Sequence, residues 1–347
     1  MKKAMSFLLA AIMTLSLSAC GSGNSTSNPS NDAATDSETP DGATYAITMA
    51  TAGATGSGDV ACGKKFVELV DKASNGRIKV TFHTDSTLGS EMENIQQIKT
   101  GEIQMTCLGD NFCSQVATGL DPTVIPFTFK TPDDVKAVYS DDTLGTMIAQ
   151  AAKDNANSYL IGLNLRSPRL LTANKEIKTP DQLKGVKLRL PEIEAHVKVW
   201  SSLGAMPTVV ALAETYSALQ TGVVDAQENP IDYIYNNKFY EVNKYIMKTE
   251  HIQGLFHWMI NADFFDSMAE EDQQILTDAL QEACDWADSE MEKQSQECWD
   301  NILAGGDVTA VDVDKNVWIE AAQDGVNAAL STMDPAAQEY VANYLSK

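Results

Sequence analysis

The order of structural elements is decided by residues 78–107, which read IKVTFHTDSTLGSEMENIQQIKTGEIQMTC. Apolar side chains alternate over 78–82 and again over 103–107, and this period of two predicts a strand at each place. Between them, residues 91–99 predict a short helix that ends at Gly101, because glycine is common just past a helix C-terminus. A strand, a helix and another strand in this order are typical of an α/β sheet.

The same alternation extends outward from this stretch. On its N-terminal side, residues 45–50 predict a strand and residues 60–73 a helix whose apolar side chains share one face. On its C-terminal side we expect helices at 144–152 and 214–220 and strands at 159–165 and 186–190. Residues 43–347 are more than a single compact core usually holds, so we expect two lobes.

The C-terminal part of the chain predicts helices. Residues 267–303 are rich in Glu, Gln, Ala, Asp and Leu and contain neither Pro nor Gly, so they predict one helix of unusual length, broken at Gly305. Two shorter helices are expected at 316–330 and 336–345. A helix as long as 267–303 can cross both lobes.

The N-terminus predicts export from the cytoplasm. A basic start precedes an apolar run over 7–17 that is too short to span a bilayer, as in a signal peptide. The segment LSAC, which ends at Cys20, resembles the bacterial lipobox, in which the cysteine is lipidated and becomes the mature N-terminus. We therefore expect a signal peptide at 1–19, then a lipidated Cys20 and a flexible linker over 20–42. The alternative is a plain surface tail on a secreted protein.

Composition excludes some partners. The chain has 48 acidic and 25 basic residues and a net charge of −23, which argues against binding nucleic acid or anionic lipid through a basic patch. After Cys20 the cysteines are odd in number and show no CxxC spacing, so neither a disulfide framework nor a zinc ribbon is predicted. We expect these cysteines to be buried as small hydrophobic residues.

Motifs of common enzyme classes are missing from the sequence. The histidines form no HExxH, no GxSxG occurs, and the glycine-rich segment 53–58 lacks the order of a nucleotide-binding loop. We therefore expect no enzymatic activity, no metal and no cofactor.

The predicted strand 186–190 carries a cation where α/β sheets bind ligands. Its apolar residues alternate with Lys187 and Arg189, so the two cations share the opposite face. Arg189 stands at the C-terminal end of this strand, directly before Pro191. A buried guanidinium needs an anionic partner. That partner is either a ligand or one of the protein's own carboxylates, and the spacing alone favours an internal ion pair.

Several blocks follow one another as in a known family. They read KGVKLRLP at 184–191, GAMPT at 204–208 and ETYSALQTGVVDAQENP at 214–230. Shorter blocks flank them, with NGRI at 75–78, LGSE at 88–91, GEIQM at 101–105, PF at 126–127, KFYEV at 238–242 and TEH at 249–251. In this order the blocks resemble the TRAP transporter solute-binding proteins of the DctP type, over most of the chain after the linker.

The resemblance implies a site for a carboxylate. In that family the arginine of a K-x-R-x-P strand binds the substrate carboxylate, and Arg189 stands at this position. A second arginine precedes the second lobe, which gives Arg169, with Arg166 as the nearby alternative. The asparagine of a Q-E-N-P motif also reaches the ligand, which gives Asn229; without the resemblance it would be a turn residue before proline. A planar guanidinium suits this role, since it can donate two parallel hydrogen bonds to one carboxylate.

Residues near these four positions complete the expected site. The family lines its cleft with residues after the G-x-I-x-M strand, which gives Asp110 as a hydroxyl acceptor or, alternatively, an acidic turn residue. The family often carries an aromatic residue where Leu212 stands, so we expect no ring stacking there. Glu192 and Glu194 follow Arg189 closely; near an anion site they would repel a second carboxylate and accept hydroxyl groups, unless they only start a surface helix. This favours hydroxylated monocarboxylates such as uronates or aldonates.

The resemblance also implies the architecture and the partners. It gives an α/β, two-lobed fold like that of periplasmic binding proteins, with lobe 1 at 43–165 plus 255–294 and lobe 2 at 166–254 plus 295–347. The expected function is extracytoplasmic capture of an organic acid by a lipid-anchored monomer and its delivery to TRAP membrane subunits. The alternatives are a C4-dicarboxylate-binding component of such a transporter and a ligand-sensing lipoprotein with the same fold.

Overall fold

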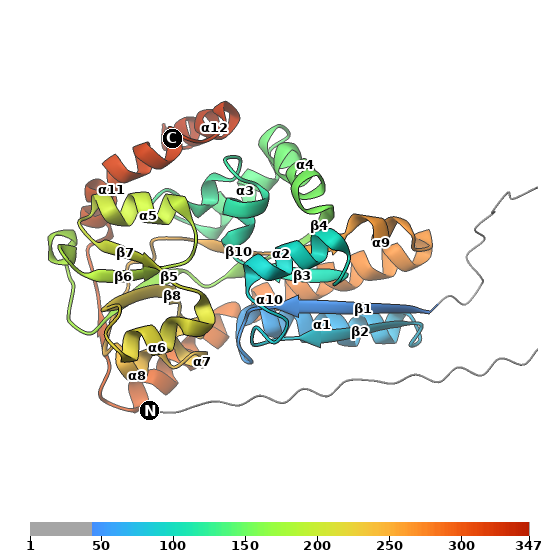
Figure 1. The fold of residues 1–347 in the computed structure, drawn as a ribbon, viewed down its shortest axis with the longest axis horizontal. Coiled ribbons are helices and arrows are strands. Elements are labelled where there is room, and N and C mark those ends of the chain that lie inside the picture. Colours follow the sequence, from blue (N-terminus) through green and yellow to red (C-terminus); the bar gives the residue numbers. More distant parts are fainter. Residues whose placement is uncertain (1–43, 347) are drawn as a thin grey trace, which may run out of the picture. The chain divides into compact units, whose positions relative to one another are not determined.

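The computed structural model describes residues 44–346, which belong to one compact unit (Figure 1). The expected signal peptide at 1–19, and Cys20 with the linker at 20–42, lie outside the described residues. Within them the chain is α/β with two mixed sheets, as predicted. The exact lobe boundaries stay a prediction.

The first sheet has five strands in the order β2-β1-β3-β10-β4. Its strands are β1 Tyr45–Thr51, β2 Ile78–His83, β3 Met105–Leu108, β4 Ser158–Arg166 and β10 Gly254–Asn261. The strands β2, β1 and β3 are parallel and are linked by the helices α1 Gly58–Ala73 and α2 Glu91–Thr100, while β10 runs antiparallel to β3 and β4. The predicted order of the N-terminal elements is therefore confirmed, and the chain returns to this sheet after leaving it.

The second sheet has six strands in the order β11-β9-β5-β8-β6-β7. Its strands are β5 Arg169–Ala173, β6 Lys187–Leu190, β7 Met206–Val209, β8 Ala226–Pro230, β9 Tyr245–Met247 and β11 Thr309–Val311. The parallel pair β6 and β8 lies beside β5, which is antiparallel to β8. The central strands carry buried residues at almost every position, as expected for a sheet covered on both faces.

Helices cover both sheets (Figure 1). Besides α1 and α2 they are α3 Pro132–Tyr139, α4 Leu144–Ala156, α5 Glu194–Ser202, α6 Thr215–Gln220, α7 Ile231–Asn236, α8 Phe239–Val242, α9 Ala262–Asp266, α10 Glu270–Ala304, α11 Lys315–Leu330 and α12 Pro335–Leu345. Short helical turns of other types lie at Phe112–Val116, Pro122–Val124, Pro180–Leu183 and Leu212–Glu214.

The long helix α10 joins the two halves of the fold. It has 35 residues and packs against α1 and β4 beside the first sheet and against α7 beside the second. The predicted start at Ser267 is wrong, because α9 ends at Asp266 and α10 begins only at Glu270, where three acidic residues occupy its first turn. None of the helices in residues 44–346, α10 included, is both long and apolar enough to cross a bilayer.

One predicted strand is also shorter than expected. Ile103 is buried, but it precedes β3, which begins at Met105. Gly101 adopts a left-handed conformation with φ of 77°, and the amide of Glu102 still donates to the carbonyl of Gln97, 2.9 Å away. The end of the helix therefore occupies the residues that alternation alone assigns to the strand.

Candidate functional site

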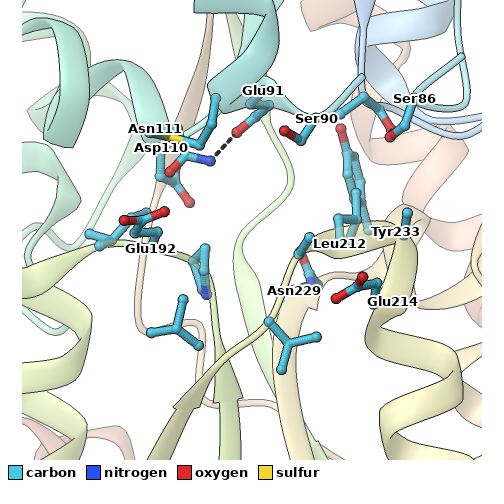
Figure 2. Close-up of a pocket in the computed structure, with 18 of the residues that line it drawn as sticks. Ser86, Ser90, Glu91, Asp110, Asn111, Glu192, Leu212, Glu214, Asn229 and Tyr233 are labelled. Atoms are coloured by element: carbon cyan, nitrogen blue, oxygen red, sulfur yellow. Dashed lines mark hydrogen bonds between the residues drawn. The ribbon is translucent and has the colours of Figure 1, made fainter. Parts of the chain in front are cut away.

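The main candidate site is a cavity of about 530 Å³ lined from both sheets (Figure 2). Every site residue expected from the sequence lines it, namely Asp110, Arg166, Arg169, Arg189, Glu192, Leu212 and Asn229. Figure 2 shows Asp110 and Glu192 at one side of the cavity and Leu212 and Asn229 at the other. The fold therefore brings together residues that are up to 119 positions apart, from Asp110 to Asn229.

Arg189 reaches this cavity from the end of β6 and is only 3% exposed. Its Nε donates to the backbone carbonyl of Val210, 2.8 Å away. Among residues 44–346 no carboxylate lies within ion-pair distance of it, so the internal ion pair that the spacing favoured does not form there. Burial accordingly lowers the pKa of Arg189 to about 10. A buried cation in this state is a strong anion receptor.

Arg169, the first residue of β5, is in contrast held by the protein's own acids. Its Nε and Nη2 donate to the carboxylate of Glu228, Nη2 also donates to the Glu228 carbonyl at 2.8 Å, and Nη1 donates to Asp110 at 2.8 Å. A guanidinium has five N–H groups. Four of them are used by these contacts, which leaves one N–H on Nη1 for a ligand.

Glu228 is the centre of a buried network. Besides Arg169 it contacts His251, whose Nε2 lies 2.9 Å from its carboxylate, and His196 at 3.7 Å. Burial alone would raise the pKa of Glu228, but Arg169 and the two histidines reverse this effect and hold the pKa well below its ordinary value. An ionised Glu228 fixes the orientation of Arg169 at the cavity wall.

Arg166, at the end of β4, contacts Asp110 and lies near two aromatic rings. Its Nη1 donates to Asp110 at 3.3 Å, and the guanidinium carbon lies 4.6 Å from the ring centre of Tyr233 and 5.1 Å from that of Phe256. A side chain at Gly109 would place its Cβ 2.6 Å from this Nη1, so the approach requires glycine. Burial would raise the pKa of Asp110, but Arg169 and Arg166 outweigh it and lower that pKa.

The remaining expected residues surround Arg189. Asn229 is buried and donates from Nδ2 to Gln227 at 2.7 Å, which fixes its amide. Glu192 is exposed, and its carbonyl accepts from the side chain of Gln115 at 3.1 Å. Glu194 lies in the first turn of α5, as the helix-start alternative required. Leu212 places an aliphatic side chain in the wall, so no ring is available there.

Sequence reasoning missed several other lining residues, among them Ser86, Ser90, Glu91, Tyr233 and Glu214 (Figure 2). Glu91 accepts from the amide of Gly109 at 2.8 Å and from the side chain of Asn111. Burial raises its pKa. The only available signal was Ser90-x-x-Glu93, a capping box that marks the start of α2 and so the position of Glu91 at its first residue.

Comparison with known proteins gives this geometry a family. Residues 50–331 match the family model described as bacterial extracellular solute-binding protein, family 7 (DctP). The chain belongs to this family. Family 7 proteins of this kind are the solute-binding components of TRAP transporters, so the protein binds a solute and is not an enzyme.

Curated relatives of this family 7 protein are also solute-binding proteins. It is 31% identical to a solute-binding protein of Roseobacter denitrificans over 77% of this chain and 81% of the relative. It is 28% identical to the 2,3-diketo-L-gulonate-binding periplasmic protein YiaO of Escherichia coli over 74% of this chain and 78% of the relative.

Solved structures support the fold. A TRAP periplasmic solute-binding protein of Roseobacter denitrificans with bound L-galactonate is 28% identical and superposes with a TM-score of 0.76, covering 82% of this chain and 94% of that one. A Sulfitobacter protein of the same kind, with bound β-D-galacturonate, is 22% identical and reaches a TM-score of 0.80 over 86% and 98% of the two chains.

Proposed function

We propose that this solute-binding protein captures a hydroxylated monocarboxylate, such as an aldonate or a uronate, and delivers it to TRAP membrane subunits. The observation that carries the proposal is Arg189, a nearly fully buried guanidinium at the cavity wall that pairs with none of the carboxylates in residues 44–346. Arg189 uses one N–H group on Val210. Its other N–H groups can donate to both oxygens of a ligand carboxylate.

The other two arginines support a single carboxylate rather than two. Arg169 and Arg166 already share Asp110, and Arg169 also holds Glu228. Only one N–H of Arg169 remains to help Arg189 clamp the carboxylate. A second ligand carboxylate would compete with Asp110 for Arg166 and Arg169 and would lie among acidic side chains, which is unfavourable.

Acidic groups around the cavity favour hydroxyl groups along the rest of the ligand. Glu91, Asp110, Glu192 and Glu214 all line it, and ionised carboxylates accept hydrogen bonds without donating any. Asn229 adds an amide that both donates and accepts. The ligands named for the Roseobacter protein and for YiaO, L-galactonate and 2,3-diketo-L-gulonate, are sugar acids of this kind.

Capture and delivery follow from the architecture. The cavity is lined from both sheets, so a ligand in it can draw the two walls together. The LSAC segment ending at Cys20 supports a lipid anchor, which would keep the binding protein beside its membrane subunits.

A ligand screen tests the proposal directly. Thermal shift and calorimetry are measured with galactonate, gluconate, glucuronate, galacturonate and sialic acid, and with succinate, malate and fumarate as the dicarboxylate set. A ligand at 100 times its Kd stabilises the protein by about 2.7 kcal/mol. Stabilisation by sugar acids alone is the expected result. Stabilisation by dicarboxylates alone would show that Arg166 or Arg169 releases its acid to bind a second carboxylate, and would overturn the monocarboxylate assignment.

A further inference from the structure

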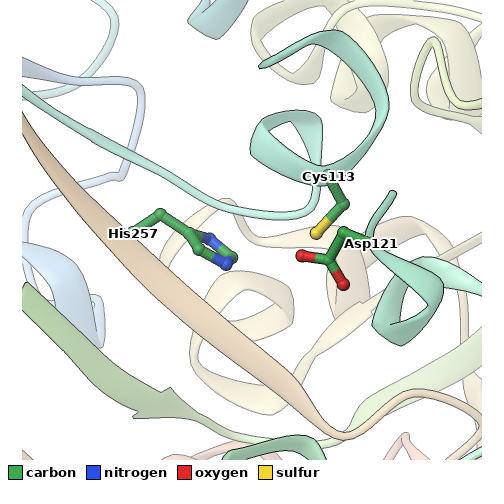
Figure 3. A group of neighbouring side chains, drawn as sticks. All are labelled: Cys113, Asp121 and His257. Atoms are coloured by element: carbon green, nitrogen blue, oxygen red, sulfur yellow. The ribbon is translucent and has the colours of Figure 1, made fainter. Parts of the chain in front are cut away.

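Outside the ligand cavity, three side chains suited to metal binding converge in the core beside the first sheet. Cys113, Asp121 and His257 are all buried, and their ligand atoms lie within 4.8 Å of one another. Figure 3 shows them pointing toward one another, His257 from β10 and the other two from the segment after β3. Their sequence spacing gives no metal motif, because Cys113 and Asp121 lie 144 and 136 positions before His257.

Neighbouring groups hold these side chains in the orientation that a cation needs. The amide and hydroxyl of Thr123 donate to one oxygen of Asp121, at 2.9 and 2.7 Å. Nδ1 of His257 lies 3.4 Å from the carbonyl of Leu108, and Phe112 stacks on the ring with 4.3 Å between centres. The second oxygen of Asp121 and Nε2 of His257 therefore face the cluster. Metal ligands are commonly supported by hydrogen bonds of this type.

A fourth possible ligand atom, the hydroxyl oxygen of Tyr139, lies between them. The hydroxyl of Tyr139 donates to Asp121, lies 2.5 Å from Nε2 of His257 and lies 4.0 Å from Sγ of Cys113. One hydroxyl proton is thus shared between two acceptors in a buried site. A thiol, a carboxylate, an imidazole and a phenol around one point form a donor set that suits zinc.

The charge of the cluster also requires a cation. Asp121 is fully buried, and no lysine or arginine of residues 44–346 pairs with it. A buried carboxylate with only neutral partners is unfavourable. A divalent cation bound by this carboxylate and by a thiolate would make the site neutral.

An entry route is present. A second cavity of about 410 Å³ is lined by Cys113 and Asp121, and Ser114, Gln115 and Thr118 also border it. An ion can therefore reach the cluster from this cavity without passing through the ligand cavity. Lysine and glutamate side chains of α5 form part of the same wall.

We propose that Cys113, Asp121 and His257, with the hydroxyl of Tyr139 as fourth donor, form a site for a zinc-type divalent cation. Donor atoms around tetrahedral zinc lie roughly 3.3–3.8 Å apart. On binding, the widest separation must therefore close by about 1 Å, and the Tyr139 hydroxyl, 2.5 Å from Nε2 of His257, must move away by about as much. The cation replaces the shared hydrogen bonds of Tyr139, and the thiol proton of Cys113 leaves to solvent.

The test uses the mature chain purified without a polyhistidine tag. Zinc is titrated against a chelating dye and measured by mass spectrometry after desalting, and the Co²⁺ form is recorded by absorption. We expect one zinc per chain and a thiolate-to-Co²⁺ charge-transfer band. Cys113→Ala should remove the band and lower zinc affinity at least ~100-fold. Cys298→Ala, a buried cysteine outside the cluster, should change neither.

Two outcomes would overturn the site. The first is a wild-type chain whose Co²⁺ spectrum has no thiolate band, a result that needs no variant to fold. The second is equal zinc affinity in wild type, Cys113→Ala and His257→Gln, since surface carboxylates would then hold the ion. Binding of the organic acid is measured in parallel; because the ligand cavity shares none of these four residues, either proposal can fail while the other stands.

Discussion

Arginines 166, 169 and 189 line one cavity but differ in what already holds them. Arg169 donates four hydrogen bonds to Glu228 and Asp110, Arg166 donates one to Asp110, and Arg189 donates one to a backbone carbonyl. The sequence pattern treats Arg169 and Arg189 as equal members of a clamp. Within residues 44–346, Arg189 keeps four N–H groups without an acceptor and Arg169 keeps one, so the proposed function gives Arg189 the larger share of this clamp.

This difference predicts the effect of a conservative substitution. Arg189→Lys keeps the charge but loses the planar pair of donors, so ligand affinity should fall by about 2 kcal/mol or more, roughly 30-fold. Calorimetry with the best ligand of the screen measures it. The matched control is Arg77→Lys, at an arginine that pairs with Asp272 away from the cavity, and it should leave affinity unchanged. Equal affinity in both variants would remove Arg189 from the site.

The network around Glu228 predicts a loss of stability. Glu228→Gln removes the charge that compensates Arg169 and leaves a buried guanidinium with Asp110 alone. Breaking a fully buried ion pair typically costs 3–5 kcal/mol, so we expect a loss of about that size in urea unfolding. A loss below about 1 kcal/mol would show that Asp110 suffices to hold Arg169.

The same carboxylate predicts a pH dependence. The folded pKa of Glu228 lies well below the ordinary value of 4.5, so its contribution to stability is present above pH 4.5 and is lost as pH falls through the folded pKa. Wild type should therefore lose stability below about pH 4.5 faster than Glu228→Gln does. Urea midpoints of the two proteins, measured between pH 7 and pH 3, compare them; parallel curves would contradict the prediction.

At the scale of elements, the packing of α10 on β4 depends on a missing side chain. A Cβ at Gly162 would lie 2.7 Å from Cδ2 of Leu280, which is fully buried. Gly162→Ala should therefore cost roughly 1–3 kcal/mol by overpacking. The double variant with Leu280→Ala should cost less than the sum of the two single variants, because the smaller side chain makes room. Urea unfolding measures all three.

The control for this packing test is Gly305→Ala at the end of α10. There a Cβ would meet its nearest atom at 3.4 Å, an ordinary contact. We expect a change within about 0.5 kcal/mol. Strict additivity of the Gly162 and Leu280 variants would show that β4 and α10 adjust independently.

Long helices were predicted well from the sequence, and very short strands were not. The helices α1 and α11 were predicted to within two residues, because many apolar positions fix their phase. The strands β9 and β11 have three residues each, too few for any alternation to show. The break between α9 and α10 was missed because neither Ser267 nor Met268 is a residue that stops helices. The N-cap Asn261, whose side chain accepts from the amide of Phe264, starts α9 as a separate short helix.

Site residues could be predicted from the sequence only where they stand in a family motif. Arg189 and Asn229 stand in blocks whose order is specific, and both line the cavity. The pairing of Arg169 with Glu228 joins positions 59 residues apart, and β5 beside β8 creates it. Tyr233 reaches the wall from α7 and the cluster of Cys113 with His257 spans two distant segments, so no local pattern could indicate either.

At the scale of the whole molecule, a strongly acidic chain binds an anion. The net charge of −23 repels an approaching carboxylate at long range, while Arg189 attracts it only at the cavity. Salt shortens the screening length from about 30 Å at 0.01 M to about 8 Å at 0.15 M. Association should therefore become faster as salt rises over this range, which stopped-flow fluorescence measures. A slower association would show that the arginines dominate the long-range field.

The return of β10 to the first sheet sets a limit on protein engineering. This strand lies between β3 and β4, although nearly ninety residues that build the other sheet separate β4 from it in the chain. A gene fragment that stops before Gly254 would lack the strand that joins β3 to β4, and would leave an unpaired edge on each of them open to aggregation. Chimeras that exchange ligand preference between relatives must therefore splice at every crossing between the sheets at once, and a biosensor built by splitting the chain must rely on fragment complementation.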